Sequence, residues 1–214
     1  FNSGNSGGCR PKCLWHDREG AWLVKFRHTY DPKDIGRMEY KYNEVARKCG
    51  INVPDYKLLD GKYFASKRFD IENGKRLHIA TAGALLNESI SNPKLDYKVL
   101  LHLTGYLTQD SQQVDEMFQR MVFNVLTDNK DDHVKNFSFI CREGKWSLAP
   151  AYDLTLCKEG YHGEHATLAN NKGNPDIEDM LAVGESIRIP RRKGMEIINH
   201  MINHCQEILS TRFE

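Results

Sequence analysis

The sequence predicts an α+β protein with two lobes, a small β-rich lobe followed by a larger, mostly helical lobe. Three observations support this fold class. Strand and turn patterns fill most of the first part of the chain, helical patterns dominate from Thr81 onward, and no internal repeat divides the sequence. A chain of 214 residues is long enough for two lobes that share a cleft. We therefore expect the first lobe over residues 1–70 and the second over residues 71–214.

The elements of the first lobe follow from local patterns. The segments "KCLWHD" and "AWLVKF" flank the turn "REG", as the strands of a β-hairpin would. Apolar residues recur at helical spacing over residues 38–49, and Gly50, a common helix C-terminal residue, follows them. Two further strands, "NVPDYKLL" and "KYFASKRF", are expected around "DGK".

The second lobe is predicted to consist mainly of helices. They cover residues 81–86, 97–107, 114–127, 176–183 and 194–211. Asp110 and Gln113 are spaced as a capping box at the start of the third helix. The segment "FSFICREGKWSLAP" is predicted to form a short hairpin between the third and fourth helices.

Composition and charge limit the class of protein. Hydrophobic residues make up 40% of the chain and charged residues 28%, as is ordinary for a soluble globular protein. A net charge of +1 gives no electrostatic reason to expect direct binding of nucleic acid or of an anionic membrane. No apolar run approaches the roughly 18 residues of a membrane span, and no secretory signal is visible. Six cysteines without a CxxC pair favour reduced thiols and a cytoplasmic location.

Carboxylate and amide side chains are concentrated in "TDNKDDHVKNFSFI", residues 127–140. Asp131 and Asn136 stand five residues apart, which is the spacing in a kinase catalytic loop, where the Asp accepts the substrate hydroxyl proton and the Asn holds magnesium. Asp153, in "AYDLT" beyond the hairpin, lies where a second metal-binding carboxylate would be needed. The adjacent Asp132 is expected to serve local loop structure. Alternatively, the segment "DDHVKN" is a solvated turn without a catalytic role, and Asp153 lies in a β-turn.

The other parts of a phosphoryl-transfer site occur upstream in the order found in kinases. The stretch "SGNSGG" could cradle phosphates with its backbone N–H groups, or could be a flexible linker. Lys25 ends a strand, as the phosphate-binding lysine of a kinase does, and Glu39 on the next helix could pair with it; alternatively, both are solvated surface charges. The segment "SKRFD" falls where a hinge between lobes would contact adenine, or is an edge strand. The order of these segments along the chain favours a protein-kinase-like fold.

These motifs resemble those of the HipA-like Ser/Thr kinases, the toxins of bacterial toxin–antitoxin modules. The resemblance covers nearly the whole chain and rests on "GGCRPK", "WLVKF", "GINVP", "SKRFD", "RMVFNVLTDNKDDHVKNFSF" and "LAPAYDLT". It implies a catalytic base at Asp131, magnesium ligands at Asn136 and Asp153, and an ATP-phosphate lysine at Lys25. It also implies a phosphate loop with Gly7 and Gly8, backbone contacts to adenine from Lys67 and Phe69, and a D-x-H-x-K-N loop completed by His133 and Lys135.

The resemblance also implies how the protein works. It implies an ATP- and Mg²⁺-dependent kinase with an aminoacyl-tRNA synthetase as substrate class, growth arrest as outcome and a helix-turn-helix antitoxin as partner. Members commonly silence themselves by phosphorylating a serine of the glycine-rich loop, for which Ser3 and Ser6 are the candidates here; Asn5 stands where some relatives have that serine.

Full-length members of the family have an additional N-terminal subdomain. Short-form, HipT-like members have it as a separate small protein. Since nothing precedes Phe1 in this sequence, we expect either that this segment is missing or that the chain is a short form with that small protein as a further partner.

Two other classes of protein are alternatives. A metal-binding module could use His162 and His165, or His200, His204 and Cys205, because His200 and His204 lie one helical turn apart. A catalytically inactive kinase-fold scaffold could bind nucleotide and a protein partner. Pseudokinases usually lose one residue of the Asp, Asn and Asp set, and the sequence retains all three, which favours an active enzyme.

Overall fold

A four-stranded antiparallel sheet forms the first part of the molecule. The computed structural model describes residues 10–89 and 95–211. The sheet has the order β1-β2-β4-β3, with strands β1 (Lys12–Asp17), β2 (Gly20–Lys25), β3 (Tyr56–Leu59) and β4 (Tyr63–Lys67). Both predicted hairpins are therefore present, although the third strand is shorter than the sequence pattern suggested. Strand β2 lies between β1 and β4, and its buried side chains Trp22 and Val24 form a small core with Cys13 and Ala65.

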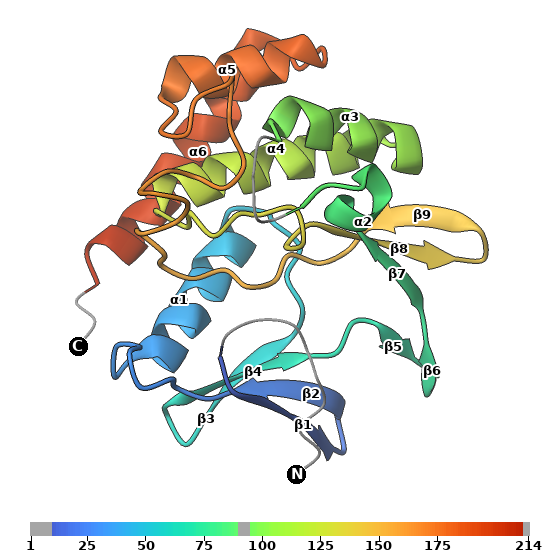
Figure 1. Cartoon of the computed structure of the whole chain (residues 1–214), viewed down its shortest axis with the longest axis vertical. Helices are drawn as coiled ribbons and strands as arrows, with labels where there is room; N and C mark the ends of the chain where they lie inside the picture. The colour runs from blue at the N-terminus through green and yellow to red at the C-terminus, as the bar shows by residue number, and fades with distance from the viewer. Residues whose placement is uncertain (1–9, 90–94, 212–214) are drawn as a thin grey trace.

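Helix α1 (Ile35–Lys48) follows β2 and lies between the sheet and the helices of the second lobe (Figure 1). It begins at Ile35 instead of the predicted Met38. Gly36 explains this early start, because a Cβ atom at this position would lie 1.9 Å from the carbonyl oxygen of Lys62. The missing side chain lets the first turn of α1 approach the backbone at the start of β4. Packing on β4, which no local pattern encodes, therefore sets the helix start.

The second lobe combines helices with a small sheet. Helices α3, α4, α5 and α6 lie together at the end of the molecule away from β1–β4 (Figure 1). The helices are α2 (Ala82–Leu86), α3 (Tyr97–Thr108), α4 (Ser111–Leu126), α5 (Ile177–Ser186) and α6 (Arg191–Leu209). The strands are β5 (Ile71–Glu72) paired with β6 (Lys75–Arg76), and a three-stranded sheet of β7 (His78–Thr81), β8 (Ser138–Arg142) and β9 (Lys145–Leu148).

Several details of the second lobe differ from the sequence prediction. Strands β5 and β6 were not predicted, and α4 and α6 begin at Ser111 and Arg191 instead of residues 114 and 194. Strand β7 was not predicted, and it pairs antiparallel with β8. The Asp110 carboxylate caps α4 by accepting from the Gln112 N–H, while the Gln113 side chain donates to the same carboxylate instead of completing a capping box. The reciprocal capping box is found at α5, between Asp176 and Asp179.

One hydrophobic core joins α1 to the second lobe. Tyr42 of α1 is fully buried, and its ring meets Phe123 of α4 edge-on, with centroids 6.1 Å apart. The Tyr42 hydroxyl donates to the carbonyl of Thr127 at 2.6 Å, just after α4 ends. Because α1 packs on the sheet and on this core together, its position relative to both lobes is fixed. Within residues 10–89 and 95–211, no helix combines the length and apolar composition that a membrane crossing requires.

The close approach of α1 to β4 gives a test of this packing. Gly36→Ala should lower the free energy of unfolding by about 1–3 kcal/mol, because the added methyl group overlaps the Lys62 carbonyl and the helix must move. Gly105→Ala in α3 is the matched control, since its Cβ would meet only Val114, at 3.4 Å, and alanine favours helix. Urea unfolding followed by circular dichroism measures both. Equal stability of Gly36→Ala and the unchanged chain would contradict the packing described.

Candidate active site

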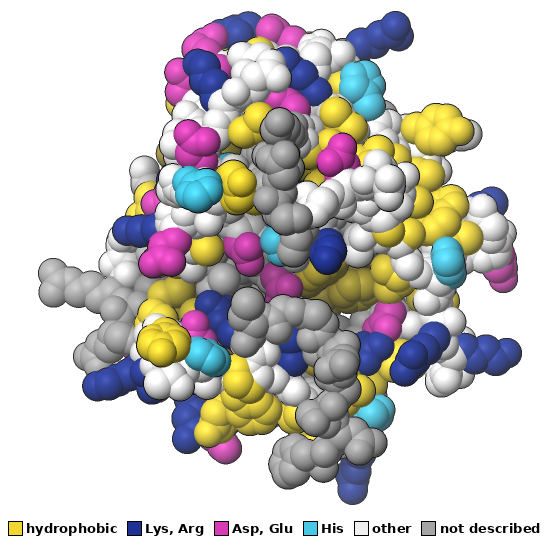
Figure 2. Space-filling view, in the orientation of Figure 1, with side chains coloured by type: hydrophobic (Ala, Val, Ile, Leu, Met, Phe, Trp, Pro, Cys, Tyr) yellow, Lys and Arg dark blue, Asp and Glu magenta, His cyan; other side chains and the backbone are white. Residues whose placement is uncertain are grey.

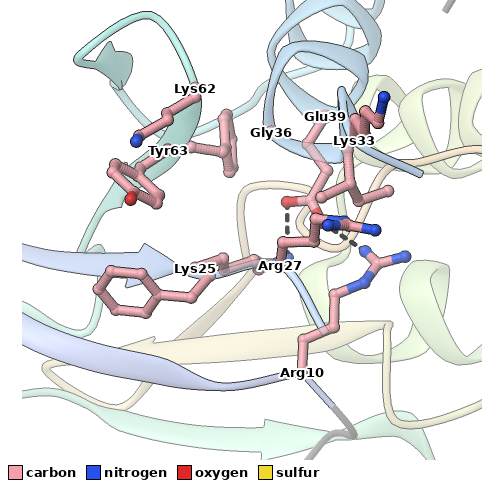
Figure 3. Close-up of a pocket in the computed structure, with 11 residues that line it drawn as sticks. Arg10, Lys25, Arg27, Lys33, Gly36, Glu39, Lys62 and Tyr63 are labelled. Carbon is pink, nitrogen blue, oxygen red and sulfur yellow. Dashed lines mark hydrogen bonds and ion pairs between the residues drawn. The ribbon is translucent and has the colours of Figure 1, made fainter. Parts of the chain in front are cut away.

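Lys25 connects three separate elements of the structure. It is the last residue of β2, and its side chain is 11% exposed. Its Nζ atom lies 3.0 Å from Oε2 of Glu39 on α1, as Figure 3 shows, and it also donates to Oδ1 of Asp153 in the loop after β9. Glu39 is 2% exposed. The predicted pairing of Lys25 with Glu39 is therefore present, and the predicted metal-binding carboxylate lies against the same ammonium.

These contacts keep Lys25 and Asp153 charged. Burial alone would lower the pKa of the Lys25 ammonium, but the charges of Asp153 and Glu39 more than offset this and raise that pKa above its ordinary value. The charge of Lys25 lowers the pKa of the Asp153 carboxyl. The site therefore presents a fixed positive charge beside an ionised carboxylate at neutral pH. Figure 2 shows acidic and basic side chains next to one another where the strand-rich half meets the helical half.

Asp153 has a backbone conformation that few residues adopt. Its φ of 55° lies in the left-handed region, which Asp and Asn tolerate better than most side chains. Such conformations cluster at functional sites. The preceding Tyr152 fixes this segment: its ring stacks on Phe69 with centroids 5.8 Å apart, and its hydroxyl donates to the Lys135 carbonyl at 2.6 Å. Burial raises the pKa of Tyr152 to about 12, so the hydroxyl stays protonated.

Hydrogen bonds within the predicted catalytic loop stabilise its conformation. The Asn136 amide donates through Nδ2 to the Asp131 carbonyl at 2.7 Å, and the Asn136 N–H donates to the His133 carbonyl at 2.8 Å. The Asp131 side chain faces solvent, with His133 Nε2 at 3.8 Å from its Oδ1. The surrounding protein still removes enough water to raise the pKa of the Asp131 carboxyl, and the charge of His133 only partly offsets this. An exposed carboxylate of raised pKa is suited to accept a proton.

The neighbouring Asp132 has the opposite environment. It is 1% exposed, and its carboxylate accepts from the Tyr97 hydroxyl at 2.6 Å, from the Ala166 N–H at 2.8 Å and from His165 Nδ1 at 3.0 Å. Burial raises the pKa of Tyr97, which keeps its hydroxyl a donor. The structural role expected for Asp132 agrees with these contacts. It anchors the loop to α3 and to the segment that follows Asp153, while Asp131 is left accessible.

Some predicted site residues make other contacts or lie outside the described residues. The Lys67 N–H donates to the Asp55 carbonyl at 2.8 Å, just before β3, and the expected backbone contact of Lys67 with adenine stays a prediction. Phe69, just beyond β4, stacks on Tyr152, and its expected backbone contact with adenine stays a prediction. The side chain of Lys135 is exposed. Gly7, Gly8, Ser3 and Ser6 lie outside residues 10–89 and 95–211.

Three residues of the site were not assigned a role from the sequence, and a fourth, His165, was considered only as a metal ligand. Arg10 donates through Nη1 to Glu39 Oε1 at 2.6 Å and through Nε to Asp31 Oδ1 at 3.1 Å. Tyr152 supports Asp153, and Tyr97 and His165 hold Asp132. Two sequence features could have identified residues of the site: Arg10 lies within "GGCRPK", and Tyr152 directly precedes Asp153. Nothing local marks Tyr97 or His165, because their partner lies more than thirty residues away in sequence.

The metal-binding alternative lacks a ligand set in the part of the chain that the structure describes. No group of three or more His, Cys, Asp or Glu side chains is arranged there to hold a metal ion. His165 is engaged by Asp132. His200 and His204 lie on one face of α6 with ring centroids 4.8 Å apart, as the sequence spacing predicted. A two-histidine pair alone does not make a structural zinc site, which needs four ligands.

Comparison with solved structures establishes the fold class. HipA in the Shewanella oneidensis MR-1 complex of HipA, HipB and operator DNA aligns over 97% of this chain and 58% of its own, with a TM-score of 0.77 and 18% identity. The Helicobacter pylori proinflammatory kinase CtkA aligns over 93% of this chain and 90% of its own, with a TM-score of 0.61 and 16% identity. The predicted two-lobed, protein-kinase-like fold is thus confirmed.

The family follows from sequence comparison. The chain belongs to the HipA-like C-terminal domain family, whose model matches residues 4–209, and the resemblance noted in the motifs is confirmed. A Sinorhizobium fredii protein named "Putative kinase Y4dM" is 27% identical over 169 residues, which cover 71% of this chain and 41% of that protein. The chain therefore spans less than two thirds of the length of both Y4dM and the Shewanella HipA.

The unequal environments of the twin carboxylates predict unequal effects on stability. Asp132→Ala should lower the free energy of unfolding by about 3 kcal/mol or more, because four buried donors, including the Thr167 N–H, lose their acceptor. Asp131→Ala should stay within about 0.5 kcal/mol of the unchanged chain, because its side chain is exposed. Urea unfolding of the two variants side by side measures this difference. If both variants were equally stable, Asp132 would not anchor the loop.

Proposed function

We propose that this chain is an ATP- and Mg²⁺-dependent protein kinase that phosphorylates serine or threonine and serves as the toxin of a toxin–antitoxin module. The observation that carries this proposal is the Lys25 ammonium held between Glu39 and Asp153. In kinases, the corresponding lysine and glutamate pair, and the metal-binding Asp must be in place together with that pair. Family membership supports the same activity.

The residues present suit a nucleotide with magnesium. Mg²⁺ prefers oxygen ligands, and Asp153 and Asn136 offer a carboxylate and an amide. The lowered pKa of Asp153 keeps it ionised. Because Asn136 uses its Nδ2 on the Asp131 carbonyl, its amide oxygen remains available as a ligand. Bound Mg²⁺–ATP would supply the phosphoryl group and neutralise its developing charge.

The chain's own residues have separable tasks in this proposal. Asp131 accepts the proton of the substrate hydroxyl, which its solvent-facing carboxylate can reach. Asn136 holds the Asp131 backbone by a hydrogen bond to its carbonyl, and the buried Asp132 anchors the loop to Tyr97 and Ala166. Lys25 places positive charge on the phosphates, and Glu39 orients Lys25. His133 and Lys135 complete the loop, and Phe69 is proposed to contact adenine.

Partners and substrate are proposed from kinship. The Shewanella HipA structure contains HipB and operator DNA. We propose a helix-turn-helix antitoxin as partner, with any DNA contact made by the antitoxin, since the net charge of this chain is only +1. A separate small protein equivalent to the N-terminal subdomain is a further proposed partner. The proposed substrate class is an aminoacyl-tRNA synthetase, and the proposed sites of autophosphorylation are Ser3 and Ser6.

The proposed activity is tested by phosphate transfer from labelled ATP·Mg²⁺, with and without cell lysate. The unchanged chain should label itself at Ser3 or Ser6 and label a lysate protein, with sites located by mass spectrometry. Asp131→Asn should reduce transfer by about 10²–10⁴-fold, because the proton acceptor is lost. Asp128→Asn, a carboxylate of the same stretch, is the matched control and should transfer normally. ATP-dependent thermal stabilisation without any transfer would instead identify a nucleotide-binding scaffold.

A further inference from the structure

A cavity lies directly behind the Lys25–Glu39 pair. It has a volume of about 230 Å³ and is enclosed by the end of β2, the first turns of α1 and the start of β4. Its apolar lining comes from Phe26, Ile35, Tyr63 and Phe64, of which Ile35 and Phe64 are buried. The Phe26 and Tyr63 rings meet edge-on, with centroids 5.3 Å apart. This lining would accept an apolar side chain of a binding partner.

The charges around the cavity are strongly unequal. Five Lys or Arg side chains and a single carboxylate line it: Arg10, Lys25, Arg27, Lys33, Lys62 and Glu39 (Figure 3). Lys25 and Arg10 are already paired with Glu39. Within the described part of the chain, no carboxylate lies within 4.0 Å of the charged ends of Arg27, Lys33 or Lys62, all three of which are exposed. The rim therefore carries an uncompensated positive charge.

The start of α1 contributes less to this potential, because the carboxylate of its N-cap residue Asp34 partly offsets the charge of the helix end. That carboxylate lies 3.9 Å from Arg37, and no acidic residue occurs in the first turn of the 14-residue helix. Ile35 and Gly36 of that turn line the cavity. The N-terminal end of a helix carries a partial positive charge and unpaired N–H groups, which favour an anionic ligand. The cationic rim, the helix start and the apolar lining together favour an anionic ligand that also carries an apolar group.

We propose that this cavity is the docking site for an acidic segment of a protein partner. The segment inserts an apolar side chain between Phe26, Tyr63 and Phe64, and its carboxylates lie against Arg27, Lys33 and Lys62. Charge complementarity identifies the partner chemistry, because opposite potentials steer association and disfavour basic or neutral segments. Glu39 forms one wall of the cavity and also holds Lys25, so a docked segment would add contacts that keep Glu39 against Lys25. This regulatory consequence rests on the proposed kinase function; the binding itself does not.

Peptide binding to the purified chain without nucleotide tests the proposal. The probe is a short fluorescein-labelled peptide with two phenylalanines flanked by glutamates, and the matched peptide has glutamine at every glutamate. By fluorescence anisotropy, the acidic peptide should bind about tenfold more tightly than its neutral match. The double variant Lys33→Glu/Lys62→Glu should lose about tenfold in affinity for the acidic peptide. Lys145→Glu, an exposed cation of β9, is the control and should bind like the unchanged chain.

Two sets of outcomes overturn the docking site. One is absent binding, or equal affinity for the two peptides. The other is unchanged affinity in the double variant, provided that its circular dichroism and unfolding midpoint match those of Lys145→Glu. The same peptide added to the phosphate-transfer assay should raise the rate. If the peptide binds but no variant transfers phosphate, the docking site is supported and the kinase proposal is wrong. If phosphate is transferred but the peptide does not bind, the kinase proposal is supported and the docking site is wrong.

Discussion

The buried ammonium of Lys25 is the contact on which the rest of the site depends. It joins β2 to Glu39 on α1 and to Asp153 in the second lobe. A buried charge is tolerated only when its partners are in place, and removing one partner from such a pair typically costs about 3–5 kcal/mol. Helix α1 must therefore lie where Glu39 reaches Lys25, and the loop after β9 must return to the sheet. Lys25 therefore adds a polar link between the two lobes to the apolar packing of α1.

The proposed catalytic loop depends on a difference in environment between two adjacent carboxylates. Asp132 is buried among donors from α3 and from the segment after Asp153, whereas Asp131 faces solvent. Asp132 anchors the backbone, so the neighbouring Asp131 side chain is held in place while it stays exposed to solvent. This division explains how a loop so rich in charge is anchored to the helical lobe. The same logic applies at Glu39, which Arg10 holds from the side opposite Lys25.

Much of this site could be predicted from the sequence because its signals are local. The five-residue step from Asp131 to Asn136 corresponds to a hydrogen bond within one loop, and the position of Lys25 at a strand end follows from alternation in β2. The contacts of Tyr97, His165 and Arg10 could not be predicted in this way. They join residues 29 to 35 apart in sequence, and no periodicity encodes such pairing. The start of α1 and strand β7 were missed for the same reason, since each depends on packing against a distant strand.

The central claim is that Lys25, Asp153 and Asn136 form one site for ATP·Mg²⁺, and calorimetric titration with ATP tests it most directly. The unchanged chain and Asp153→Asn would each be titrated in Mg²⁺ and in EDTA. We predict that Mg²⁺ tightens ATP binding to the unchanged chain and that this gain is lost in Asp153→Asn, because an amide is a poorer ligand than a carboxylate for a hard cation. An Asp153→Asn chain that stays folded and keeps the full Mg²⁺-dependent gain in affinity would contradict the account.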